Sequence, residues 1–195
     1  MSRDLRVIKT QENIRSHFIS LLDEYTFQEI TVKMLIHVCK INRSTFYRNY
    51  NDKYDLLEQI SDDLLKQYKK AVCKEIVTLP PDCLQNLPFY LHPLVDFFDE
   101  NKKLLLTLDK NFIPVHLFDN MDKMMNSCFL EGFQSSYAIK DIKKATYYLN
   151  VITSNILTTM KWWHYTCPEL SKKEIIDILI TCITKGVFLS MKELT

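Results

Sequence analysis

The chain of 195 residues contains 25 basic and 24 acidic residues, and its formal net charge of +1 excludes a general attraction to nucleic acids or acidic surfaces. Hydrophobic residues make up 47% of the chain, enough for a sizeable core, and only two residues are glycine. Because turn-dense β folds and phosphate-binding loops need glycine, this composition favours an all-α fold.

The sequence also predicts a cellular compartment. The N-terminal residues alternate in charge, and no apolar stretch approaches the roughly 20 residues that a membrane-spanning helix needs. The six cysteines are scattered without a CxxC pair, which indicates buried thiols rather than a disulfide framework. We therefore expect a cytoplasmic protein with no membrane partner.

A first helix is predicted over residues 4–25, followed by a more informative segment, residues 31–50, with the sequence TVKMLIHVCKINRSTFYRNY. Apolar residues recur there at helical spacing, and Thr31 precedes them as a predicted N-cap. Ile41 then lies in a tight turn, Asn42 is a predicted second N-cap, and Phe46 falls where a core contact is needed. This pattern predicts a helix-turn-helix.

The outward side of the second helix carries guanidinium, hydroxyl and amide groups, which contact phosphates and base edges in a major groove. Five basic residues and one acidic residue give the segment from Thr31 to Lys53 a charge of +4. The predicted DNA-binding residues are Thr31, Lys33, Asn42, Arg43, Ser44, Thr45, Tyr47, Arg48, Asn49 and Lys53.

Individual roles within this set remain open. Arg43 or Arg48 could bind guanine, and Asn42 or Asn49 adenine, but a phosphate contact explains each residue equally well. Tyr47 and Lys53 are predicted phosphate contacts, and Ser44 and Thr45 are predicted to contact base edges or phosphate. Nearer the N-terminus, Arg3, Arg6 and Lys9 could contact phosphate, but solvated surface is the favoured interpretation.

Residues 27–57, with the sequence FQEITVKMLIHVCKINRSTFYRNYNDKYDLL, resemble the DNA-binding domain of the TetR family of bacterial transcriptional regulators. The likeness covers three helices and their spacings. Two residues depart from the family pattern: Cys39 stands where Ala is usual, and Lys40 stands where the turn commonly has Gly. Lysine at this position would be strained if the turn required a positive φ.

The second half of the chain is predicted to be helical throughout. Asp52 is a predicted cap for a long fourth helix, and four prolines make residues 79–92 the predicted connector. Further helices are predicted near residues 93–100, 102–109, 114–134, 141–165 and 171–192, the last begun by a capping box of Ser171 and Glu174. The predicted domains are a helix-turn-helix domain at 1–50, a connecting helix at 51–79 and a regulatory and dimerisation domain at 80–195.

The last two predicted helices carry apolar stripes that suit a dimer interface, although an intrachain core would produce the same pattern. Residues 156–188 resemble the DhaS-type subgroup of TetR regulators, in which two such helices from each subunit form a four-helix bundle. The predicted interface residues are Leu149, Ile152, Ile156, Met160, Trp163, Ile175, Ile178, Leu179, Ile183 and Val187.

The family resemblance also implies a ligand pocket in the C-terminal domain, and Met and aromatic walls would suit an apolar or aromatic effector. Packed core is the competing interpretation for every wall residue. The predicted pocket residues are Phe97, Phe98, Leu104, Met121, Met125, Phe129 and Tyr148.

Together these features predict a homodimeric, sequence-specific regulator that binds double-stranded DNA at a palindromic operator and is released by a small molecule. The alternative is a helical adaptor that acts through a protein partner and has no small-molecule ligand. An enzyme is not expected, because neither His37 with Cys39 nor His164 with Cys167 makes a metal site alone and no nucleophile motif occurs. We therefore predict no catalytic residue, no metal and no cofactor.

Overall fold

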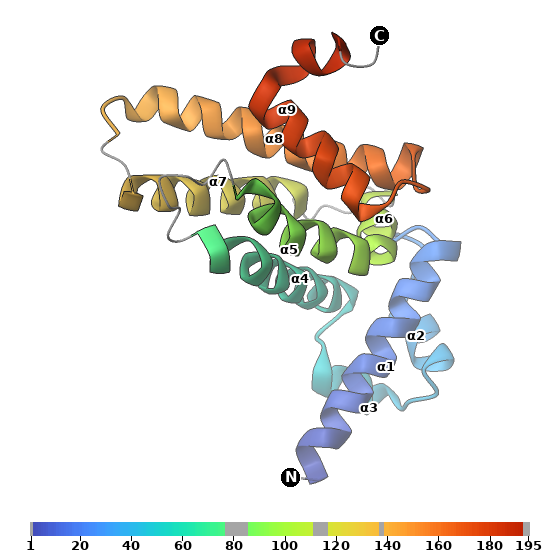
Figure 1. The fold of residues 1–195 in the computed structure, drawn as a ribbon. Coiled ribbons are helices and arrows are strands. Elements are labelled where there is room, and N and C mark those ends of the chain that lie inside the picture. Colours follow the sequence, from blue (N-terminus) through green and yellow to red (C-terminus); the bar gives the residue numbers. More distant parts are fainter. Residues whose placement is uncertain (1, 77–85, 111–116, 137–138, 193–195) are drawn as a thin grey trace. The chain divides into compact units, whose positions relative to one another are not determined.

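The computed structural model describes residues 2–76, 86–110, 117–136 and 139–192, and within them it gives no side-chain positions for 2–4, 73–76, 136 and 187–192. The described part contains helices and no strand, which confirms the all-α prediction (Figure 1). The helices are α1 (Ser2–Glu24), α2 (Val32–Val38), α3 (Arg43–Asn49), α4 (Lys53–Ile76), α5 (Leu87–Glu100), α6 (Lys102–Lys110), α7 (Leu117–Ser136), α8 (Ile142–Thr166) and α9 (Lys172–Lys192).

The chain forms two compact units. The first comprises Met1–Leu64 and Lys103–His116, and the second comprises Leu65–Lys102 and Leu117–Thr195. This division differs from the predicted domains in two places, because α4 is shared between the units and most of α6 belongs to the first. Asp23 of α1 gives a reason for the second difference: its carboxylate accepts a hydrogen bond from Thr107 at 2.9 Å and pairs with Lys103 at 3.0 Å.

The core of the first unit holds the helix-turn-helix against α1. Ile14 and Phe18 recur at helical spacing on α1 and are fully buried, as is Leu35 of α2. Phe18 meets Phe27 edge to face, with ring centroids 6.2 Å apart. Asn13 ties α1 directly to the turn, because its side-chain amide donates to the Cys39 carbonyl oxygen at 3.0 Å.

The helix starts in this unit follow the capping rules. The Thr31 hydroxyl accepts from the Met34 N–H at 3.2 Å, which confirms it as the N-cap of α2. Asp52 accepts from the N–H groups of Tyr54 and Asp55, which confirms its capping role for α4. Asn42 occupies the N-cap position of α3, but its side chain makes no capping hydrogen bond.

The turn between α2 and α3 requires a left-handed residue, and that residue is Lys40 with φ of +52°. The Ile41 N–H donates to the Ile36 carbonyl, and the Lys40 N–H donates to the His37 carbonyl, both at 3.2 Å. These two bonds define a Schellman motif, whose penultimate position is usually glycine. Lys40 therefore holds a strained backbone conformation at the point where the helix-turn-helix bends.

The second unit stacks α4, then α5 and α7, then α8 and α9 (Figure 1). Tyr68 of α4 is fully buried, and its ring lies 5.3 Å from that of Phe97 and 6.0 Å from that of Phe98 on α5. Asp141 caps α8 through the Lys144 N–H. Ser171 and Glu174 form the predicted capping box at the start of α9, with reciprocal bonds of 2.8 and 3.3 Å.

The predicted connector over 79–92 is wrong for its last residues, because α5 begins at Leu87. Pro88 lies in the first turn, where a missing N–H has little cost, and only Pro93 lies inside the helix. Residues 79–85 lie outside the described part of the chain. Proline does not prevent a helix here, because burial of Leu91, Leu94 and Val95 stabilises the helix.

The prediction of one continuous final helix is also wrong. Gly186 interrupts α9 with φ of +75° and ψ of 158°, a conformation open to glycine and strained for other residues. A side chain would find open space there, so the backbone conformation alone accounts for the glycine.

Among the described cysteines, Cys39, Cys167 and Cys182 are free thiols. Cys128 is disulfide-bonded, so the expectation of thiols throughout is wrong for that residue. Cys39 packs as a small apolar group between α1 and α2, and burial raises the pKa of its thiol to about 11.

Replacing Lys40 with glycine should stabilise the protein by about 1 kcal/mol, because the left-handed backbone is strained for lysine and not for glycine. Urea unfolding followed by far-ultraviolet circular dichroism measures the change. Lys33→Gly is the matched control, since it removes the same side chain from a right-handed helical residue and should destabilise. If Lys40→Gly lowered the midpoint as Lys33→Gly does, the turn would not carry this strain.

Candidate nucleic-acid interface

The second helix of the helix-turn-helix, α3, is anchored by one side and open on the other. Phe46 is fully buried, and its ring lies 5.9 Å from that of Tyr50, which is also buried. A helix of seven residues is not stable alone in water, so this packing holds it in place.

The side chains predicted to contact DNA fall mostly on the open side of α2 and α3. Thr45 and Asn49 are half-buried at the edge of that side. The exposed members of the predicted set are Thr31, Lys33, Asn42, Arg43, Ser44, Tyr47 and Arg48.

Two contacts order the exposed side of α3. The Arg43 guanidinium lies 5.4 Å from the centre of the Tyr47 ring, within the range of a cation–π interaction. Tyr47 in turn meets the buried Phe46 ring edge to face at 5.5 Å, although 45% of Tyr47 is exposed. Arg43 and Tyr47 are thus held relative to the core before any ligand binds.

Asn42 and Asn49 differ in which side-chain hydrogen-bonding groups remain available to DNA. The Asn49 side-chain amide donates to the Thr45 carbonyl at 2.8 Å, which uses one of its donors. Asn42 makes no side-chain capping bond, so both its amide and its carbonyl remain available. A bidentate contact with adenine needs a free donor and a free acceptor, and this favours Asn42 over Asn49.

Lys53 does not have the role that the sequence predicted. Its ammonium donates to the carbonyl oxygens of Phe27, Gln28 and Ile30 at 2.8, 3.0 and 2.8 Å. An ammonium has three donors, so none remains for a phosphate in this arrangement. The nitrogen also lies 4.7 Å from the centre of the Phe27 ring. Lys53 fastens the start of α4 to the loop between α1 and α2.

The cations of the open side are not neutralised by acids. Within the described residues, no ion pair involves Lys33, Lys40, Arg43 or Arg48, whereas Arg15 on α1 pairs with Asp63 at 2.7 Å. The local excess of positive charge predicted from the sequence is therefore available to an anionic partner.

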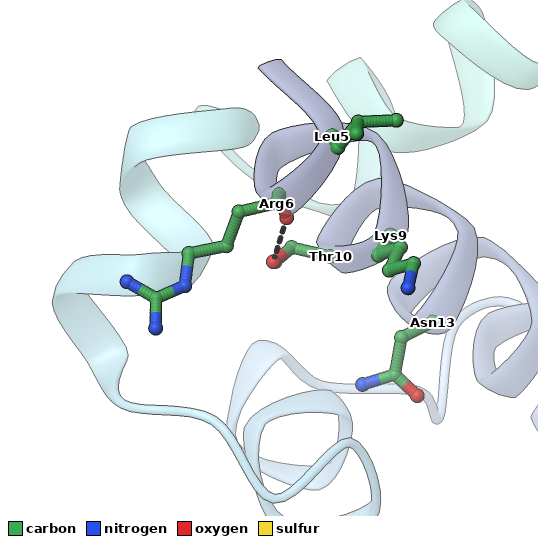
Figure 2. A pocket seen from close by; sticks show the side chains of 5 residues that line it. All are labelled: Leu5, Arg6, Lys9, Thr10 and Asn13. Carbon is green, nitrogen blue, oxygen red and sulfur yellow. Dashed lines mark hydrogen bonds between the residues drawn. The ribbon is translucent and has the colours of Figure 1, made fainter. Parts of the chain in front are cut away.

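Sequence reasoning missed a hollow on α1. It has a volume of about 370 Å³ and is lined by Leu5, Arg6, Lys9, Thr10 and Asn13 (Figure 2). These residues share one side of α1 by helical spacing. The sequence contains a signal for this arrangement, because the spacing places Arg6 and Lys9 on the same side of α1 as Asn13, which contacts the turn after α2.

The fold can be compared with known proteins. A TetR transcriptional regulator from Streptococcus agalactiae 2603V superposes with a TM-score of 0.64 and 24% identity, over 94% of this chain and 98% of that chain. This chain has the TetR fold. No family model matches the sequence.

One curated relative shares part of the sequence. It is the uncharacterized HTH-type transcriptional regulator YxbF of Bacillus subtilis (strain 168), 23% identical over 92 residues. The match covers 47% of this chain and 24% of YxbF, so it spans about a quarter of the relative's length. The DhaS-type subgroup stays a prediction.

In the TetR fold of this chain, most predicted dimer residues lie in the core of the second unit. The prediction is wrong for Leu149, Ile156, Met160, Trp163, Ile175 and Leu179, which are buried within the single chain. Ile152, Ile178 and Ile183 are half-buried, and Val187 lies outside the residues whose side chains are described. The apolar stripe therefore reflects an intrachain core, which is the alternative to a dimer interface that the sequence left open.

The predicted pocket residues are brought together only in part, because Phe97, Phe98 and Met125 all contact Tyr68. Phe97, Phe98, Met121 and Met125 are buried in the second unit, and Phe129 is half-buried there. Leu104 belongs to the first unit. Tyr148 is 61% exposed on α8, so its assignment to a pocket is wrong.

Two buried polar groups lie in the same core. Burial and the charge of Asp122 raise the pKa of Tyr68, whose hydroxyl donates to the Met125 sulfur at 3.5 Å. Burial and the charge of Lys102 lower the pKa of His164 to about 4, against the opposing effect of Asp99. Both side chains are therefore neutral near pH 7.

No metal centre is formed by the described residues, among which no three His, Cys, Asp or Glu side chains gather as ligands. No helix within the described ranges combines the length and the apolar character needed to cross a membrane.

Replacing Lys53 with methionine should destabilise the first unit by roughly 2–3 kcal/mol, because three carbonyls lose a charged donor. Thermal unfolding measures the loss, with Lys33→Met, which removes an exposed lysine, as the control. A phosphate-binding lysine would behave differently: its loss would leave the melting temperature unchanged and reduce only DNA affinity.

Proposed function

We propose that this protein is a dimeric, sequence-specific DNA-binding transcriptional regulator, a repressor released from a palindromic operator by a small molecule. The observation that carries the proposal is the open side of α3. Buried Phe46 fixes that side in place; Arg43, Tyr47 and Arg48 are exposed on it, and neither arginine pairs with an acid in the described part of the chain. The TetR fold and the partial similarity to an HTH-type regulator support the same function.

Contacts with DNA can be assigned by what each side chain has available. Asn42 has both hydrogen-bonding groups free at the start of α3, where recognition helices contact base edges. Arg43 is held against Tyr47, and a guanidinium in a fixed position suits a bidentate contact with guanine. The Tyr47 hydroxyl and Arg48 are assigned to phosphates, which position the helix without selecting sequence.

Dimerisation is assigned to a different face of α8 from the predicted one. Tyr147, Val151, Trp162 and Tyr165 are exposed and recur at helical spacing on the side opposite the buried Ile156 and Met160. Helix α8 thus has a second apolar face, which we name the outer α8 face and which a second copy would cover. A two-fold axis there would present two α3 helices to half-sites about one DNA turn, ~34 Å, or more apart.

The effector is assigned to the aromatic core around Tyr68. Met125 contacts the Tyr68 hydroxyl, and Met121 is also fully buried in the second unit; their flexible thioether side chains can repack around an apolar or aromatic molecule. Binding there would release DNA only if the effector prefers the state that does not bind the operator.

The proposal is tested first by selecting bound sequences from a randomised duplex pool. We expect a palindromic motif, and we expect Tyr47→Ala and Arg48→Ala to weaken binding of all sequences similarly, because both contact phosphate. Fluorescence anisotropy at two salt concentrations should show a steep decrease of affinity with salt. No enrichment by the wild type would favour the adaptor, and an altered motif with Tyr47→Ala would refute its phosphate role.

Replacing Val151 with arginine should convert the dimer to a monomer, because it places a charge at the centre of the outer α8 face. Analytical ultracentrifugation measures the mass, and circular dichroism should be unchanged because Val151 is exposed in the single chain. Glu131→Arg, at an exposed position on α7, is the matched control. A variant that stays dimeric would place the interface elsewhere.

A further inference from the structure

Two cations, Arg6 and Lys9, line the hollow on α1. In Figure 2 the Arg6 side chain extends to the left of Thr10, and the Lys9 side chain lies on the right, above Asn13. Both are exposed, and neither has an ion pair or hydrogen bond from its charged group within the described residues. The Thr10 hydroxyl donates back to the Arg6 carbonyl oxygen at 2.8 Å, so this donor is already used within α1.

The hollow is fixed to the helix-turn-helix. Asn13 lines it and also donates to the Cys39 carbonyl at 3.0 Å, and the Cys39 thiol approaches the Asn13 carbonyl at 3.9 Å. Residue 39 ends α2 and precedes the turn to α3. The position of this part of α1 relative to the turn before α3 is therefore set by folded contacts within the first unit.

The adjoining turn carries a third cation at a structural cost. Lys40 follows Cys39 and is exposed, with the positive φ that glycine would adopt without strain. A strained lysine directly after the residue that Asn13 contacts suggests a use for its charge. Glu12 follows Lys9 by three residues on α1. The two side chains make no ion pair, so Glu12 does not neutralise Lys9.

We propose that the hollow binds one phosphate of the operator backbone, with Arg6 and Lys9 as donors and Lys40 adding charge from the turn. This rests on the proposed function and extends it, since it assigns α1 a DNA contact outside the bases that α3 reads. A phosphate fits better than a base edge, because both cations of the lining are donors without an acceptor and the Asn13 amide already donates to the Cys39 carbonyl oxygen. The contact would set the orientation of α3 in the groove.

The test compares wild type with Arg6→Gln/Lys9→Gln on the selected operator. We expect affinity to decrease roughly tenfold with no change in the selected motif. The slope of log affinity against log salt should become shallower by about 0.9 per half-site. The control is Lys143→Gln/Lys173→Gln, which removes the same charge from exposed positions in the second unit.

A second measurement locates the phosphate. Single uncharged methylphosphonate linkages placed along the operator should weaken wild-type binding at one flanking position, and the double variant should be insensitive there. Circular dichroism and thermal melting check that the exposed substitutions leave the fold intact.

The outcomes separate the two proposals. No binding of any duplex by the wild type refutes the proposed function. The phosphate site alone is overturned if the double variant binds the operator with the same salt slope as the wild type. It is also overturned if the control variant shows an equal decrease in slope. A changed motif in the double variant also overturns it, because that would show base recognition.

Discussion

The burial of Phe46 is the constraint on which the candidate DNA surface depends. Helix α3 is only seven residues long and gains its stability from tertiary packing rather than from its own hydrogen bonds. Lys53 stabilises the same unit, because it fastens the start of α4 to three carbonyl oxygens of the loop between α1 and α2. The polar side of α3 is held in one orientation because its apolar side is buried in the core of the first unit.

Much of this first unit could be predicted from the sequence because its signals are local. Capping by Thr31 and Asp52 and the core position of Phe46 follow from short spacings along the chain. The role of Lys53 could not, because its carbonyl partners lie more than twenty residues away and a lysine after a helix-turn-helix is equally consistent with a phosphate contact. Lys40 was recognised as unusual, but only the backbone reveals its positive φ.

The second unit shows where periodicity fails. An apolar stripe identifies the buried face of a helix but not what buries it, and so Ile156 and Met160 were assigned to a partner when their own chain covers them. The exposed apolar residues of α8 are hard to identify from the sequence because Ser154 and Thr158 lie among them on the same face. A face that mixes apolar and polar residues has a weak periodic signal.

The outer α8 face has a consequence for how such a protein would respond to its own abundance. If two copies must meet along that face before either contacts an operator firmly, the concentration of competent dimer rises with the square of monomer concentration when dimer is scarce. Occupancy of the operator would then change more steeply than the amount of protein made. A small change in synthesis or degradation would become a larger change in transcription, without any effector.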